Sequence, residues 1–147
     1  MDLRQIYKGT ILRSYPVGGF TYLATREITV FAVIGKEKTS FTEIERAVSQ
    51  KQSLFQVSRV NDLYGVARTN SPSSGAVIVL NIDEGLKSKP EYVKELLRSA
   101  FSDISKKKLL TLDTLDDPNV EKDFWVNHRL LDMFEEAADL LEYQLAN

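Results

Sequence analysis

The segment RVNDLYGVARTNSPSSGAVIVLNID, residues 59–83, constrains the fold more than any other part of the chain. It predicts two strands joined at Asn61-Asp62, because both residues tolerate left-handed backbone conformations and fit a tight turn. A third strand follows the loop TNSPSSG, and its apolar run 76–80 is typical of a central strand covered on both faces. The segment carries no histidine and no phosphate-binding glycine motif. We therefore expect it to build a sheet and a binding surface.

Further strand patterns precede this segment. Aromatic and β-branched residues predict strands within 3–14, at 20–24 and at 28–34. Proline and glycine in YPVGG, residues 15–19, predict a turn, and the polar residues 25–27 predict another. Together, the strands predicted before and after residue 40 indicate a five-stranded sheet.

Helical patterns separate and follow the strands. Ser40 and Glu43 fit a capping box ahead of a helix whose apolar residues recur at spacings of three and four. A second helix is predicted from about Ser88, with Pro90 in its first turn. A third begins at Asp117-Pro118 and runs toward the end of the chain. The order β-β-α-β-β-β-α-α predicts an α+β fold in which a mostly antiparallel sheet is flanked by helices.

Composition excludes several classes of function. The chain has 147 residues, a formal net charge of −2 and no cysteine. Disulfides, zinc–thiolate sites and thiol catalysis are thereby excluded, and no strong basic field is present to hold nucleic acid. The N-terminus lacks the apolar region of a secretory signal, and the apolar run 28–34 is too short to span a bilayer. We expect a cytoplasmic protein, with peripheral association with membranes left open.

The sequence contains few residues that point to catalysis or metal binding. His128 is the only histidine, and no second ligand stands four residues away, so we interpret it as an ordinary helix position. Asp113, Asp116 and Asp117 could hold a hard cation, but no glycine or distal glutamate completes a calcium loop. Asp117 is also the residue type that starts a helix. We therefore expect no enzyme activity, no metal and no cofactor.

The last predicted helix has a wide apolar face. One row of residues has the 3-4 spacing of a coiled-coil seam: Leu131, Phe134, Ala138, Leu141 and Leu145. A second row lies beside it, and the remaining face is acidic. The pattern fits a helix packed on its own sheet and equally a helix offered to partner helices.

A resemblance to a known family is carried by four segments: VFAVIGKEKTSFTEI, YGVARTN, GAVIVLNIDEGLKSKPEYVKELLRSAF and LDTLDDPNVEKDF. In this order they resemble the longin domains of R-SNAREs, most of all the lipid-anchored R-SNARE without a transmembrane segment. YGVARTN followed by GAVIVLNIDEGLKSKPEYVKELLRSAF is similar to the family's central hairpin, third strand and second helix. VFAVIGKEKTSFTEI resembles its aromatic strand and first helix, and LDTLDDPNVEKDF resembles the segment that leads to the SNARE helix. The resemblance implies a longin/profilin-like fold at 1–112, followed at 113–147 by a linker and an amphipathic helix.

The resemblance also implies a hydrophobic groove between the first helix and the neighbouring sheet edge. In the family this groove receives the protein's own SNARE helix, a lipid chain or a trafficking partner. Its lining would be Phe31, Val33, Ile34, Phe41, Ile44, Val48, Phe55 and Val57. The family's central-layer arginine and C-terminal cysteines have no counterpart in residues 1–147, so a truncated SNARE and a stand-alone longin protein both stay open.

Three functions follow as hypotheses. The first is a non-catalytic longin-type interaction domain in vesicle trafficking, with SNARE helices or trafficking proteins as partners. The second is a small nucleotide- or ADP-ribose-binding protein that uses Asp113, Asp116 and the Ser/Gly loops. The third is a roadblock- or longin-like regulator of small GTPases. The residues leave the oligomeric state open.

Overall fold

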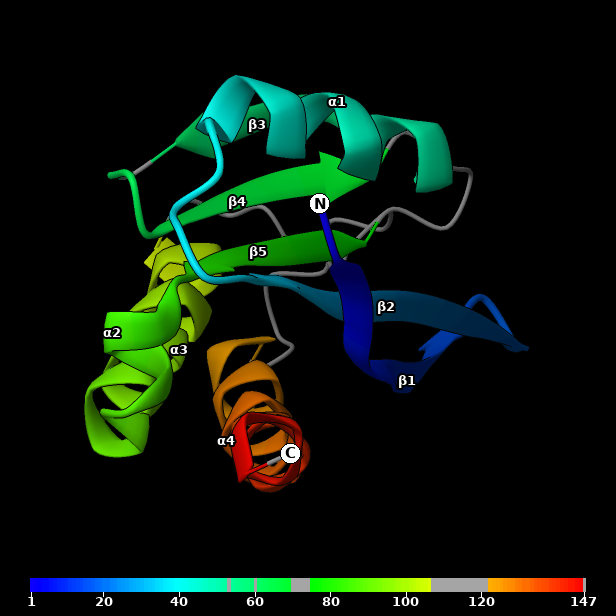
Figure 1. Cartoon of the computed structure of the whole chain (residues 1–147). Coiled ribbons are helices and arrows are strands. Elements are labelled where there is room, and N and C mark those ends of the chain that lie inside the picture. The colour runs from blue at the N-terminus through cyan, green and yellow to red at the C-terminus, as the bar shows by residue number, and fades with distance from the viewer. Residues whose placement is uncertain (53, 60, 70–74, 107–121, 147) are drawn as a thin grey trace.

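The computed structural model describes residues 1–52, 54–59, 61–69, 75–106 and 122–146. One sheet forms the centre of the molecule, and helices lie on both of its faces (Figure 1). The predicted α+β class is therefore confirmed.

The sheet is mixed and has the strand order β1-β2-β5-β4-β3. Only β2 and β5 run parallel, whereas the other neighbouring pairs are antiparallel. The strands are β1 (Leu3–Val17), β2 (Phe20–Ile34), β3 (Leu54–Arg59), β4 (Tyr64–Thr69) and β5 (Ala76–Ile82). All seven residues of β5 are buried, as its apolar run predicts.

The β1–β2 hairpin is longer than the sequence predicts. Its turn is confined to Gly18 and Gly19, both with positive φ, which is the backbone that a two-residue hairpin turn requires. The predicted turn at 25–27 is wrong, because β2 continues through these residues and Thr25 pairs with Leu12. The polar residues interrupted the hydrophobic pattern without breaking the strand, and Arg26 is itself buried.

The helices are α1 (Phe41–Lys51), α2 (Glu84–Lys87), α3 (Pro90–Lys106) and α4 (Lys122–Ala146). Ser40 is the N-cap of α1, but its side chain makes no capping hydrogen bond, so the expected capping box does not form. The one-turn helix α2 was not predicted. It begins after Asp83, whose carboxylate accepts a hydrogen bond from the Leu86 amide at 2.8 Å. The predicted helix start at Asp117-Pro118 lies outside the described residues.

Two apolar clusters hold these layers together. Between α1 and the sheet lie Phe31, Val33, Phe41, Ile44, Val48, Ala67, Val77 and Val79, named here the α1 cluster. The larger cluster lies on the opposite face and contains residues of α3, α4 and the strands above them. None of the described helices has both the length and the apolar character that crossing a membrane demands.

Asn81 is a buried polar residue of β5 that ties two loops to the sheet. Its side-chain amide donates to the Thr39 carbonyl at 2.9 Å and to the Asp62 carbonyl at 3.0 Å. Its side-chain oxygen accepts from the Thr39 amide at 3.4 Å. Because Thr39 comes just before the N-cap of α1, Asn81 fixes where this helix begins over the sheet.

We expect Asn81→Ala to lower the free energy of unfolding by about 1–3 kcal/mol for each polar group left without its partner. Urea denaturation measures the loss. The exposed α1 residue Gln50 serves as the control, since Gln50→Ala removes a side chain of similar length from the surface. Equal unfolding midpoints for the two variants would show that the Asn81 contacts contribute nothing.

Candidate functional site

Five of the eight predicted groove residues meet in the α1 cluster. Phe31 and Val33 point from β2 toward α1, and Phe41, Ile44 and Val48 point from α1 toward the sheet. Each of the five side chains is at most 4% exposed. In this arrangement they are core, and a partner would reach them only if α1 moved.

The other three predicted groove residues lie elsewhere or lack a described side chain. Ile34 belongs to the larger cluster on the opposite face, because successive residues of a strand alternate between faces. Phe55 and Val57 lie on β3, and for these two residues the structure describes the backbone alone. Periodicity selects apolar residues but does not say which of two covered faces each one joins.

The α1 cluster has two partly buried leucines at its margin, Leu3 of β1 and Leu54 of β3. β3 is an edge strand that pairs on one side with β4. Figure 1 shows α1 lying over β3. Among the described residues, the margin at Leu54 therefore combines the outer edge of the sheet, a helix and accessible apolar surface, and we call it the α1–β3 margin.

α4 occupies the opposite face, where it contacts α3 and β1 (Figure 1). Four of the five predicted seam residues are buried: Phe134, Ala138, Leu141 and Leu145. Leu131 is 51% exposed. The buried face of α4 also includes three residues of the second row, Leu130, Met133 and Ala137. The chain's own last helix thus packs on its own domain, away from α1.

Polar contacts also hold α4 to β1. The Tyr7 hydroxyl donates to Glu136, and Arg129 approaches the same carboxylate at 3.3 Å. The hydrogen bond from Tyr7, together with the charge of Arg129, lowers the pKa of Glu136. This stabilising contribution is present above the ordinary pKa of glutamate and is lost as the pH falls through the lowered value.

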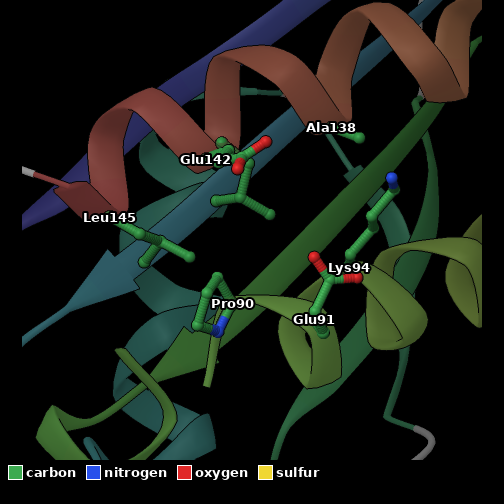
Figure 2. A pocket seen from close by; sticks show the side chains of 7 residues that line it. Pro90, Glu91, Lys94, Ala138, Glu142 and Leu145 are labelled. Carbon is green, nitrogen blue, oxygen red and sulfur yellow. The ribbon is translucent and has the colours of Figure 1, made fainter. Parts of the chain in front are cut away.

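A shallow hollow lies between the start of α3 and the end of α4 (Figure 2), and it has room for no more than about one water molecule. Its floor is apolar, formed mainly by Pro90, Leu141 and Leu145, and Glu91, Lys94 and Glu142 stand around it. These groups do not form a nucleophile–base pair. The side chains around the hollow therefore do not indicate a catalytic site.

The residues considered for catalysis or metal binding either lie outside the described residues or have no described side chain. Asp113, Asp116, Asp117 and Ser71–Ser74 lie outside the described residues, and His128 lies on α4 where only the backbone is described. Within the described ranges, no group of three or more His, Cys, Asp or Glu side chains could hold a metal ion.

Tyr64 links β4 to α3, and its contact has a testable pH dependence. Its hydroxyl donates to Asp103 at 2.9 Å. Burial, and then this hydrogen bond, raises the pKa of Tyr64 to about 12. The unfolded chain ionises its tyrosines near pH 10, so rising pH favours the unfolded state once that value is passed.

We expect the free energy of unfolding to fall as the pH rises from about 10 toward 12. The decline should be shallower in Tyr64→Phe, which has no phenol to ionise. Urea denaturation at several pH values measures both curves. Parallel curves for the two proteins in this range would contradict the role assigned to Tyr64.

No protein-family model matches the chain, and neither the curated proteins nor the solved structures include one with significant similarity to it.

Proposed function

We propose that this chain is a non-catalytic longin-type interaction domain of vesicle trafficking, and that it binds a partner helix at the α1–β3 margin. The longin-like segments of the sequence and the order of strands and helices support the assignment. One covering helix on one sheet face and two long helices on the other agree with it. The role is regulation or targeting of SNARE-type fusion machinery.

The observation that carries the proposal is that α1 buries few apolar side chains and lies beside β3, an edge strand of the sheet that the structure describes. α1 buries three apolar side chains, Phe41, Ile44 and Val48. By contrast α3 buries six, namely Val93, Leu96, Leu97, Ala100, Phe101 and Ile104. Elements with few buried apolar contacts open at lower free energy than the rest of a domain. α1 is therefore the described long helix that can shift most readily to admit a guest.

Two known modes of recognition fit this margin. An extended segment can add to the free edge of β3, or an amphipathic helix can lay its apolar face along Leu54 and α1. The partners expected from the resemblance are SNARE helices, whose heptad leucines suit the second mode. Either mode buries Leu54, which is only partly buried in the free protein.

We expect Leu54→Asp to weaken binding of soluble SNARE helices at least about tenfold, since it places an unpaired charge in the new interface. Fluorescence anisotropy with labelled helices gives the affinities. Leu86→Asp is the matched control, because Leu86 is a partly buried leucine at the margin of the other cluster. Thermal unfolding of both variants separates lost binding from lost folding.

Three results would count against the proposal. If the wild-type protein binds no SNARE helix, the proposed class of partner is wrong. If Leu54→Asp and Leu86→Asp lower the affinity for the helices equally, the proposed binding site is wrong. Thermal stabilisation by nucleotides, or capture by GTP-loaded GTPases without helix binding, would favour the nucleotide-binding or GTPase-regulating alternative instead.

A further inference from the structure

We propose that α1 is a hinged flap over the sheet, fixed at its N-terminal end beside Asn81 and able to swing away at its C-terminal end. The opening end comprises residues 48–52, which lead into β3. The motion is a property of the free protein, and only its role in admitting a partner helix rests on the proposed function.

The chain that enters α1 is tied to the central strand β5. The Gly35 amide donates to the Ile82 carbonyl at 3.0 Å. Asn81 is 1% exposed, and its side chain donates to the Thr39 carbonyl and accepts from the Thr39 amide. Moving this end away from the sheet would leave buried polar groups without their partners, which is costly. The start of α1 is therefore the fixed end.

The apolar contacts of α1 are also concentrated toward its start. Phe41 and Ile44 are buried within the first turn, and the rest of the helix buries only Val48. Residues 49–51 are exposed. Because the favourable free energy of burial grows with the apolar area removed from water, the C-terminal end of α1 is the more weakly seated.

β3 follows this end of α1 and is an edge strand of the described sheet. It begins at Leu54, three residues after the helix ends, and pairs with β4. Its register with β4 shifts between Leu54 and Gln56, and such an irregularity locally disrupts the ladder. The opening end of α1 is thus connected to an edge with an interrupted ladder, whereas its start is tied to β5, which has a neighbouring strand on each side.

These differences make a swing about Asn81 less costly than lifting α1 as a whole. Domains open in local units whose free energy follows the contacts that they break. A swing breaks the contacts of Val48 while those of Phe41 and Asn81 persist. It uncovers apolar side chains of the α1 cluster, against which Leu54 packs, and the apolar face of an amphipathic helix can pack there.

Single introduced thiols can report on each end of α1, because the chain contains no cysteine. Val48→Cys marks the opening end. Val33→Cys marks the fixed end, since Val33 belongs to the α1 cluster and pairs with Asn81 in the sheet. Val93→Cys lies in α3 and reports unfolding of the whole domain. The three positions are matched, because each is a valine that is at most 1% exposed.

A chromogenic thiol reagent, added to the folded full chain without any partner, should label Val48→Cys at least about tenfold faster than Val33→Cys or Val93→Cys. Low concentrations of urea should leave the fast rate almost unchanged, since a local opening exposes little surface. Circular dichroism and urea denaturation check that each variant is folded. Equal rates for Val48→Cys and Val33→Cys would overturn the hinge, because α1 then lifts, or the domain unfolds, as one unit.

The link to the partner is tested with Val48→Ala and soluble SNARE helices. Truncating Val48 lowers the cost of opening and enlarges the population that can bind, so the affinity should rise at least about threefold. Val93→Ala is the matched control and should leave the affinity unchanged. Unchanged or weaker binding by Val48→Ala would overturn the link to the partner. If the wild type binds no SNARE helix while Val48→Cys is still labelled fast, the proposed function fails and the hinge stands.

Discussion

Ile44→Asp is expected to abolish the native fold at room temperature. Ile44 lies in the N-terminal half of α1 and is fully buried in the α1 cluster, which also contains Phe31 and Val48. An aspartate there would be charged and unpaired, or would have to take up a proton. Losses above about 4–5 kcal/mol arise from buried charges of this kind, and whole domains are stable by only about 5–15 kcal/mol.

Circular dichroism and urea denaturation measure this loss. Thr42→Asp is the matched control, since Thr42 is exposed in the first turn of α1, where an acidic residue interacts favourably with the helix dipole. A folded Ile44→Asp protein with unchanged stability would mean that α1 is not seated on the sheet as described. Because the same substitution removes the fold, it is unsuitable for testing partner binding, and Leu54 serves instead.

Met133→Ala is expected to lower the free energy of unfolding by about 2–5 kcal/mol, the range for truncating a buried methionine or leucine. Met133 is fully buried beneath β1. A Cβ on Gly9 would overlap the end of the Met133 side chain, so the glycine is what gives Met133 room. The substitution therefore leaves a cavity where α4 meets the sheet.

The control for Met133 comes from the same helix. Leu131 is 51% exposed, and Leu131→Ala should change stability by no more than about 0.5 kcal/mol. Urea denaturation of the two variants compares them directly. The reverse order, with Leu131→Ala the more damaging, would indicate that Leu131 faces the domain and that α4 is rotated from the described position.

Much of the architecture could be predicted from sequence, because strands and helices differ in the period of their apolar residues. The run 76–80 and the proline at the start of α3 gave correct positions. The turn predicted at 15–19 contains the observed turn at Gly18-Gly19, but residues 15–17 belong to β1. The break expected at 25–27 was wrong because a charged residue can be buried in a paired strand, as Arg26 is. The single turn of α2 is too short to show a period.

The predicted groove shows where such reasoning ends. Phe31 and Ile34 are equally apolar, yet they lie on opposite faces of the sheet. A residue that lines a groove and one that fills a core obey the same periodicity. The resemblance therefore named five residues of the α1 cluster without showing that α1 covers them. The hydrogen bonds of Tyr7 and Asn81 were not predicted for another reason. Tyr7 and Glu136 are 129 residues apart, and Asn81 sits within an apolar strand with no local motif to mark it.

Hydrogen–deuterium exchange of the full chain, with and without soluble SNARE helices, tests the central claim most directly. Its readout is the exchange rate of backbone amides in each element. Partner binding at the α1–β3 margin predicts slower exchange in α1 and β3, with little change in α3. Protection confined to α3 and α4, or no protection anywhere at helix concentrations that saturate other SNARE partners, would contradict the account.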